Sequence, residues 1–316
     1  MRLGTRRSTL ALAQAQLVAD MLGGCEIVPL VTGGDRPRQP GCGAAGSAGS
    51  IPRQAVPRQA GAEDKSRWVD ELERALSEHE IDLAVHSAKD LPGELADGLE
   101  LLGAPARAGV EDVLCGARAL DELPDGARVG TSSIRRVAQL RAARADLDVV
   151  ALHGNVDTRL ARLAGGEHAL DAILLARAGL QRLGREPDAG AVLDPARFVP
   201  APGQGTLVLE GRADDERARA AVRAINDEVT YSCLLAERAL ARDLDANCHT
   251  PLGAWAAPTD DGALHLHAWV GLPDGSAWAS DDRLGAPSQA EELAHEVAGR
   301  LRAIGADELL ARARSA

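Results

Sequence analysis

The stretch IDLAVHSAKDLP, Ile81 to Pro92, carries the local pattern from which the fold can be worked out. Its first five residues are mostly apolar and partly β-branched, which predicts a short buried strand, and Pro92 prevents a helix from continuing nearby. Lys89 and Asp90 follow the strand directly, where open α/β sheets place their functional groups. A solvated ion pair in a surface turn would explain this stretch alone equally well.

Strand-like and helix-like segments alternate around this stretch, which predicts parallel sheets joined by right-handed crossovers. A helix is expected to begin near Ser8 or Thr9 and to end at Gly23-Gly24. Further strands are predicted at 26–32, 81–85, 99–103, 112–115, 127–130, 147–152, 171–176 and 206–210, and further helices at 68–79, 214–228 and 232–244. After Gly253, alternation between Asp-Gly turns predicts a three-stranded antiparallel meander, which a helix at 288–304 closes.

Residues 33–67 lack any periodicity. They are rich in Gly, Pro, Ser, Arg and Gln and contain the triplet Pro-Arg-Gln three times, beginning at Pro37, Pro52 and Pro57. This composition predicts a mobile, poorly ordered loop, either an insertion or a lid.

Composition narrows the class of protein. The chain has 316 residues, enough for two or three domains, and its 45% hydrophobic content without a long apolar run predicts a globular protein with no membrane span. Its net charge of −12 disfavours nucleic acid as a partner. The five cysteines are scattered without metal-ligand spacing, and the N-terminal segment does not resemble a signal peptide, so we expect no metal site and a cytoplasmic location.

Cations recur in loops that open helices. Such loops are found at 5–8, 87–89, 131–136 and 154–159. A helix N-terminus offers free N–H groups and partial positive charge, and arginine in the first turn is unfavourable unless an anion binds there. Arginine is abundant throughout the chain, so one such loop means little, but together the loops favour a cleft for a polyanionic small molecule.

Cys248, in a predicted loop after a helix, is a candidate nucleophile or attachment point, and an inert buried cysteine is the alternative.

Taken together, the motifs resemble those of the hydroxymethylbilane synthase (porphobilinogen deaminase) family. The matching segments follow the family's order along the chain: TRRSTLALAQ (5–14), VTGGD (31–35), DLAVHSAKDLP (82–92), VGTSSIRR (129–136), HGNVDTRL (153–160), DAILLARAGLQRLG (171–184), PGQGTLVLE (202–210) and NCHTPLGAWA (247–256).

The resemblance implies two α/β domains similar to the lobes of periplasmic binding proteins, with the active site in the cleft between them, and a smaller C-terminal α+β domain with a three-stranded antiparallel sheet. The implied boundaries are 1–105 with 204–225 for domain 1, 106–203 for domain 2 and 226–316 for domain 3. It also implies a monomer.

By the same resemblance the protein is a transferase of tetrapyrrole (haem) biosynthesis. Cys248 would hold a dipyrromethane cofactor through a thioether, four porphobilinogen units would be added with loss of ammonia, and hydrolysis would release hydroxymethylbilane. Asp90 takes the position of the catalytic carboxylate, which would stabilise a pyrrole cation and move its proton.

Because every pyrrole carries an acetate and a propionate, the growing chain is a polyanion. By motif position, the residues implied to bind it are Arg6, Ser8, Lys89, Arg107, Ser133, Arg135, Arg136, His153, Arg159 and Arg182. His153 stands where the family often has arginine, and Lys65 and Trp68 occupy an altered lid sequence. Two alternatives share this fold: a non-catalytic anion-binding protein of the periplasmic type and an inactive paralogue.

Overall fold

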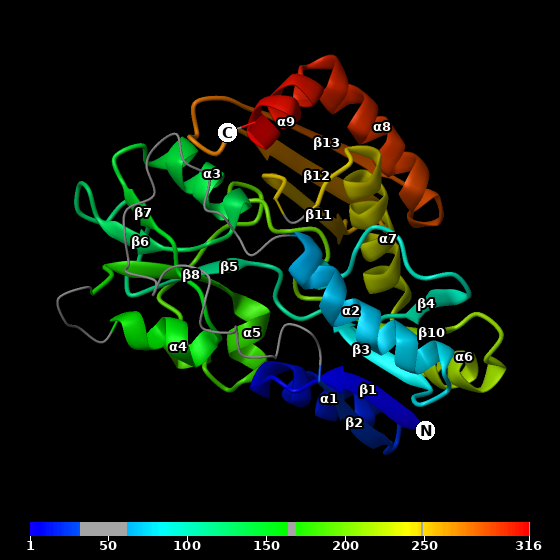
Figure 1. Cartoon of the computed structure of the whole chain (residues 1–316). Coiled ribbons are helices and arrows are strands. Elements are labelled where there is room, and N and C mark those ends of the chain that lie inside the picture. The colour runs from blue at the N-terminus through cyan, green and yellow to red at the C-terminus, as the bar shows by residue number, and fades with distance from the viewer. Residues whose placement is uncertain (32–61, 164–168, 248, 316) are drawn as a thin grey trace.

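The computed structural model describes residues 1–31, 62–163, 169–247 and 249–315. Three separate sheets organise this part of the chain, two of five strands and one of three (Figure 1). The two larger sheets are mixed α/β layers, and the smallest packs with the C-terminal helices. The predicted fold class is therefore confirmed.

The first sheet has the strand order β2-β1-β3-β10-β4. Its strands are β1 (Arg2–Arg6), β2 (Glu26–Leu30), β3 (Leu83–Ser87), β4 (Leu99–Gly103) and β10 (Leu207–Arg212). β1 is parallel to β2 and β3, as predicted, whereas β10 is antiparallel to both of its neighbours. The prediction of wholly parallel sheets is wrong here because β10 enters the sheet from the opposite end, on the chain's return from the second sheet.

The second sheet has the order β7-β6-β8-β5-β9. Its strands are β5 (Asp112–Cys115), β6 (Arg128–Gly130), β7 (Asp148–Val150), β8 (Ala172–Ala176) and the short β9 (Ala191–Val192), which was not predicted. β6 is parallel to β7 and β8, while β5 is antiparallel to β8 and β9. As in the first sheet, the antiparallel strand is the one by which the chain arrives from the other sheet.

The third sheet is the predicted antiparallel meander. It consists of β11 (Leu252–Pro258), β12 (Leu264–Gly271) and β13 (Trp278–Gly285). Alternate residues of β12, such as Leu266 and Val270, are buried in a core formed with the C-terminal helices. The chain does not end with the predicted last helix, because one more helix follows it after Gly305.

The helices are α1 (Thr9–Met21), α2 (Ala62–Ser77), α3 (Ile134–Ala143), α4 (Val156–Leu160), α5 (Arg177–Arg182), α6 (Glu216–Arg223), α7 (Glu228–Asp243), α8 (Ala290–Ala303) and α9 (Ala306–Ser315). α1 has its predicted N-cap, Ser8. Three helix predictions are wrong in their bounds. The helix predicted at 232–244 begins earlier, at Glu228. α2 begins at Ala62, inside the predicted loop 33–67, and the remainder of that loop up to residue 61 lies outside the described residues. The helix predicted at 214–228 ends at Arg223, because Asp227 caps a new helix with its side chain.

A single carboxylate joins the third sheet to both segments that cross between the larger sheets. Glu237 of α7 is fully buried and accepts hydrogen bonds from Arg107 at 2.8 and 3.0 Å, from Gly203 N–H at 2.6 Å and from Ala256 N–H at 2.8 Å. Arg107 lies on the outgoing crossing and Gly203 on the returning one. α7 thus fixes the place where the two larger sheets meet.

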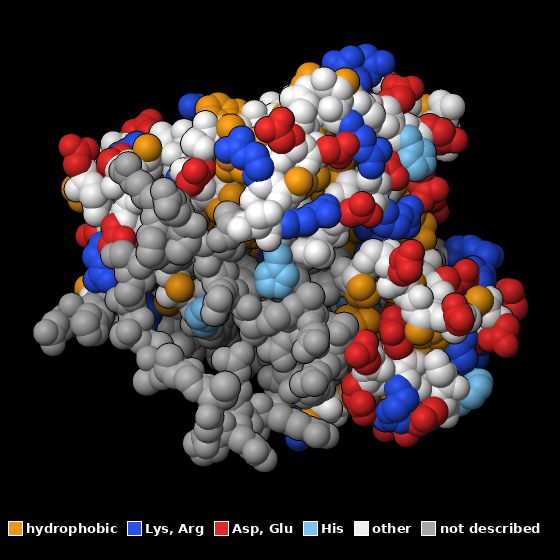
Figure 2. All heavy atoms as spheres, turned by 45° about the horizontal axis from the view of Figure 1, so that its top comes forward, with side chains coloured by type: hydrophobic (Ala, Val, Ile, Leu, Met, Phe, Trp, Pro, Cys, Tyr) orange, Lys and Arg blue, Asp and Glu red, His pale blue; other side chains and the backbone are white. Residues whose placement is uncertain are grey.

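In the described part of the chain, no helix combines the length and apolar character needed to cross a membrane. On the face seen in Figure 2, acidic and basic side chains are interspersed over the described surface. The net negative charge is therefore not gathered into one patch on this face.

Candidate functional site

A cavity of about 990 Å³ lies where the three sheets meet. The segments that follow β1, β3, β6, β7 and β8 line it, so the carboxyl ends of parallel strands from both larger sheets face the same space. The C-terminal half of α7 and, after it, Ala246, Asn247, Thr250 and Leu252 add a wall from the third part of the chain. The cavity has the size of a site for a small organic molecule.

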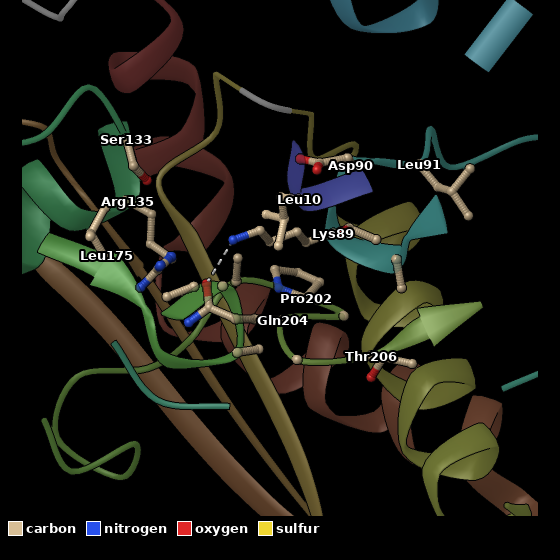
Figure 3. Close-up of a pocket in the computed structure, with 18 of the residues that line it drawn as sticks. Leu10, Lys89, Asp90, Leu91, Ser133, Arg135, Leu175, Pro202, Gln204 and Thr206 are labelled. Atoms are coloured by element: carbon tan, nitrogen blue, oxygen red, sulfur yellow. Dashed lines mark hydrogen bonds between the residues drawn. The ribbon is translucent and has the colours of Figure 1, made fainter. Parts of the chain in front are cut away.

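The opening stretch forms the wall contributed by the first sheet. β3 runs into a single 3₁₀ turn, Ala88–Asp90, and both Lys89 and Asp90 line the cavity (Figure 3). The turn packs tightly against the returning crossing: a Cβ on Gly203, whose φ is +73°, would lie 2.9 Å from the Ala88 side chain and 3.0 Å from Lys89 N. Only glycine allows this approach, which accounts for the Pro-Gly-Gln-Gly segment beside the turn.

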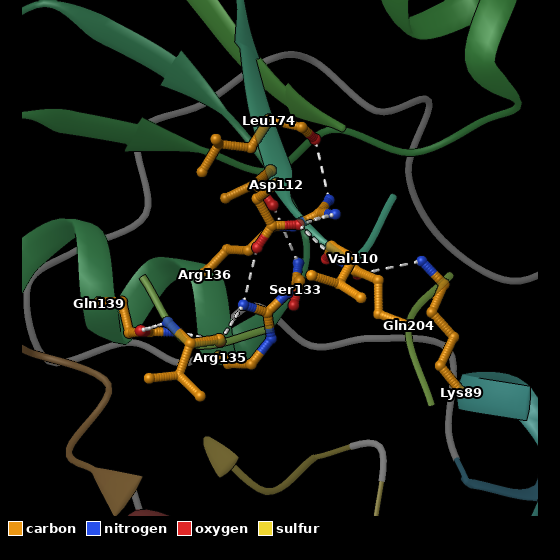
Figure 4. Close-up of polar contacts among 11 residues, drawn as sticks. Lys89, Val110, Asp112, Ser133, Arg135, Arg136, Gln139, Leu174 and Gln204 are labelled. Carbon is orange, nitrogen blue, oxygen red and sulfur yellow. Dashed lines mark hydrogen bonds and ion pairs between the residues drawn. The ribbon is translucent and has the colours of Figure 1, made fainter. Parts of the chain in front are cut away.

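The ammonium of Lys89 points across the cavity toward Gln204, with Nζ 3.4 Å from Oε1 (Figures 3 and 4). Burial, assisted by the positive charge of Arg136, lowers the pKa of Lys89 to about 8, and the charge of Asp90 opposes this shift. Lys89 is therefore a cation at neutral pH that loses its proton as the pH rises through about 8.

On the opposite wall, two arginines share one buried carboxylate (Figure 4). Asp112, at the head of β5, accepts from Arg135 Nη1 at 2.8 Å and from Arg136 Nη2 at 2.7 Å and Nε at 3.1 Å. The exposed fractions of the three residues are 0%, 4% and 5%. Although burial alone would raise it, the two arginines hold the pKa of Asp112 well below its usual range.

Gln204 links the two walls. Its Nε2 donates to Val110 O at 2.8 Å and to Asp112 Oδ1 at 2.9 Å, which leaves Oε1 to accept from Lys89. These contacts fix the orientation of the amide. One hydrogen-bonded series thus runs from the arginines through Asp112 and Gln204 to Lys89.

Helix N-termini supply further donors to the cavity. Ser8 caps α1 and Ser133 precedes α3; both line the cavity, and neither helix has an acidic residue in its first turn. Ser133 makes no side-chain capping bond. Both ends therefore retain the partial positive charge that attracts carboxylates.

The remaining predicted cations also line the cavity. These are Arg6, Arg159 and Arg182, together with His153. Burial lowers the pKa values of Arg159 and Arg182 to about 10 each, and the charge of Arg136 adds to the effect on Arg159. His153 is exposed, with Nε2 3.3 Å from Ser132 Oγ. The cavity therefore concentrates positive charge in a protein whose net charge is negative.

Arg107 is the exception among the described candidates. Its guanidinium does not line the cavity. It donates hydrogen bonds to the Glu237 carboxylate, to Gln204 O at 2.9 Å and to Ala256 O at 3.3 Å. Arg107 joins the crossing to α7 here, and its role in binding substrate carboxylates stays a prediction. The motif revealed the cation, but its counterion lies 130 residues away.

Three candidates cannot be placed. Cys248 lies outside the described residues, although Asn247 and Thr250 on either side of it line the cavity. The side chains of Lys65 and Trp68 also lie outside the description, and only their backbone, in the first half of α2, is placed.

Sequence reasoning missed three residues of the site: Asp112, Gln204 and Arg238. Asp112 gave a signal, because it is a charged residue at the head of an otherwise apolar strand. Gln204 stood within a recognised motif. Arg238 lines the cavity from α7 and gave no signal, since arginine is frequent in that helix.

The site suits a ligand with several carboxylates. Among the described residues, the buried Nε atoms of Arg135 and Arg182 have no hydrogen-bond partner, so each can donate to an added acceptor. No group of three His, Cys, Asp or Glu side chains suited to a metal ion is found within the described ranges. The donor set fits the acetate and propionate groups of a dipyrromethane.

Comparison with known proteins gives consistent matches over nearly the whole chain. Residues 1–220 match the family model "Porphobilinogen deaminase, dipyromethane cofactor binding domain", and residues 231–303 match "Porphobilinogen deaminase, C-terminal domain". The chain is 42% identical over 322 residues to a porphobilinogen deaminase of Deinococcus deserti, covering 98% of both chains. It is 41% identical to that of Thermus thermophilus, again covering 98% of both.

Solved structures with a similar arrangement are more distant. They include immunogenic lipoprotein A from Vibrio vulnificus (TM-score 0.40, 13% identity, 73% of this chain and 97% of that one). A periplasmic substrate-binding protein of an ABC transporter from Coxiella burnetii has a TM-score of 0.37 at 14% identity, covering 71% of this chain and 91% of that one. Scores this low add nothing to the topology described above.

Proposed function

The chain belongs to the porphobilinogen deaminase family, and from that premise we propose that it is an active hydroxymethylbilane synthase, a transferase of tetrapyrrole biosynthesis. It condenses four porphobilinogen molecules head to tail on a dipyrromethane primer, with loss of ammonia, and then releases hydroxymethylbilane by hydrolysis. The observation that carries the proposal is the cavity, whose lining includes Asp90, several cations and the neighbours of Cys248.

Asp90 is the proposed catalytic residue. Loss of ammonia from the aminomethyl group of porphobilinogen leaves a positively charged pyrrole, and a carboxylate beside the pyrrole N–H groups stabilises that charge. The same carboxylate can accept the proton that leaves after the new bond forms. Asp90 is half-buried on the cavity wall, where its charge also acts on Lys89 and Arg159.

The cations of the cavity are proposed to bind the acidic side chains of the pyrroles. Arg135 and Arg136 lie on the wall opposite Asp90, so carboxylates held there leave the ring between the two walls. Lys89, Arg6, Arg159, Arg182 and His153 would hold the remaining carboxylates, with Ser8 and Ser133 assisting at the helix ends.

Cys248 is the proposed attachment point. When bound through a thioether, the dipyrromethane supplies the free α-carbon at which chain growth begins. Asn247 accepts from His249 N–H at 2.9 Å and donates its own N–H to Thr250 Oγ1 at 2.9 Å, so the residues flanking Cys248 form a tight turn at the cavity. Such a turn suits an attachment point, because it limits the positions that the attached rings can reach.

We propose three domains with the boundaries 1–105 plus 204–225, 106–203 and 226–316, in a cytoplasmic monomer that does not bind nucleic acid. Lys65 and Trp68 are proposed lid residues.

Intact mass and an aldehyde colour test for pyrroles examine this function directly. Protein made in a porphyrin-competent host should carry the added mass of a dipyrromethane, give the pyrrole colour and convert porphobilinogen to hydroxymethylbilane. An unmodified Cys248 would refute the cofactor assignment. Binding of porphobilinogen without turnover would favour a non-catalytic anion-binding protein, and cofactor attachment without turnover would favour an inactive paralogue.

A further inference from the structure

A buried ion pair lies directly behind the turn that carries Lys89 and Asp90. His86 Nε2 is 2.8 Å from Glu210 Oε2, and the two side chains are 6% and 0% exposed. The register of β3 and β10 pairs His86 with Val208 and Ala84 with Glu210, so both side chains lie on one face of the sheet. Neither residue lines the cavity, and the proposed reaction does not use them.

The charges of this pair depend on each other. Although the separation is that of a hydrogen bond, neither oxygen of Glu210 nor Nε2 of His86 meets hydrogen-bond geometry with any group in the described residues. A buried carboxylate without hydrogen bonds is strongly unfavourable unless an opposite charge compensates it. The imidazole of His86, when protonated, is the adjacent opposite charge. On the α2 side, burial and then the charge of Glu210 raise the pKa of Glu73, a second carboxyl near the pair.

A second cation holds the other end of the turn. Arg238 of α7, 8% exposed, donates from Nη2 to Pro92 O at 2.9 Å and to Gly93 O at 3.0 Å. Burial and then the charge of Arg242 lower the pKa of Arg238, and the negative charge of Glu210 opposes them. Glu210 therefore faces His86 at the start of the turn, and Arg238 holds the end of the turn through Pro92 O and Gly93 O.

We propose that Glu210 is a positioning residue, which keeps the Lys89–Asp90 turn fixed between His86 and Arg238. The inference rests on the proposed role of Asp90. Displacement of a catalytic group by about 1 Å can lower a rate by about 100-fold. A carboxylate that never contacts substrate would thus control turnover through the backbone that carries the catalytic one.

The experiment compares Glu210→Gln, His86→Asn and the double variant. Turnover is measured per cofactor-loaded site, with loading determined by the pyrrole colour test. Glu210→Gln should lower kcat by about 10- to 100-fold with little change in KM. His86→Asn should be worse, because it leaves Glu210 buried without compensation. The double variant should recover to the level of Glu210→Gln, because it removes that charge.

Glu73→Gln is the matched control, since it removes a neighbouring carboxylate that contacts Ala96 N–H and not the turn; its kcat should equal that of the wild type. In an Asp90→Ala background, Glu210→Gln should add no further loss. The inference is overturned if Glu210→Gln keeps the wild-type kcat per loaded site, or lowers only the melting temperature. If His86→Asn does not fold, recovery of both folding and turnover in the double variant supports the inference. A double variant that turns over more slowly than Glu210→Gln counts against it. Absence of turnover in the wild type would instead refute the proposed function.

Discussion

The two larger sheets hold their functional side chains in different ways. On the second sheet, Arg135 and Arg136 are nearly fully buried and bound to Asp112 at 2.7 to 3.1 Å. On the first, Lys89 projects from a single 3₁₀ turn and donates to Gln204 over 3.4 Å. The difference indicates a division of labour. Under the proposed function, the arginine wall is fixed in advance to hold carboxylates, whereas the wall proposed to act on the pyrrole is a short turn whose position we infer to depend on the groups behind it.

Asp90→Ala tests this division most severely. If the Lys89–Asp90 turn carries out the chemistry and the arginine wall binds the substrate, the variant should still attach the cofactor. Its porphobilinogen turnover should fall by about 1,000-fold or more, because charge stabilisation and proton transfer are removed together. Initial rates per colour-titrated site measure the loss. Asp97→Ala, which removes an exposed carboxylate shortly after the turn, is the control. Near-normal turnover in Asp90→Ala would remove Asp90 from its proposed role.

Asp112→Asn tests whether the second wall is fixed by its shared carboxylate. Removing one partner of a buried ion pair leaves uncompensated charge, so the free energy of unfolding should fall by about 3–5 kcal/mol. Denaturant titration measures the change. Asp146→Asn, which breaks the surface contact with Arg144, should leave the midpoint unchanged. An unchanged midpoint in Asp112→Asn would show that the arginines do not need this carboxylate.

The same pair gives stability a defined pH dependence. The arginines lower the pKa of Asp112 in the folded state, so its contribution is fully present above the unfolded pKa of about 4 and is lost as the pH falls toward the lower folded value. Asp112→Asn should therefore lose less stability than the wild type between pH 5 and the acid transition. Parallel acid-unfolding curves for the two proteins would contradict this.

Substrate binding at the Lys89–Asp90 turn should depend instead on alkaline pH. Because the pKa of Lys89 is lowered to about 8, its positive charge is lost as the pH rises through that value. KM for porphobilinogen should then rise by several-fold, within the roughly tenfold range of one charge-assisted hydrogen bond. Lys89→Arg should flatten this limb of the profile, and Arg7→Gln, a change at an exposed residue outside the cavity, should not. A wild-type KM that is constant from pH 7 to 9.5 would exclude this role of Lys89.

The same contrast explains what the sequence could predict. The signals for the Lys89–Asp90 turn are local in the sequence. An apolar run followed by a proline predicts both the strand and the place where it ends. The arginine wall is non-local, because Asp112 is 23 residues from Arg135 and their meeting depends on strand order. The pairing of Arg107 with Glu237 is non-local in the same way, since no local pattern points to Glu237 as its counterion. The antiparallel entry of β10 likewise depends on how the chain returns from the second sheet.

His153 lies on the binding side but lacks the fixed charge of its arginine neighbours. Ser132 Oγ accepts from Leu152 N–H at 2.9 Å, so its own hydrogen can donate to His153 Nε2, 3.3 Å away. Arginine in this place would carry a permanent charge and several donors.

We therefore expect His153→Arg to lower KM for porphobilinogen by about two- to fivefold at pH 8 and less at pH 6, where imidazole gains charge of its own. KM at the two pH values measures the effect. His295→Arg adds the same charge on α8, where the present imidazole pairs with Asp243 at the surface, outside the cavity. An equal fall in KM in both variants would mean that substrate responds to the overall charge of the protein and not to the binding wall. A fall confined to His153→Arg would extend the fixed arginine wall by one residue.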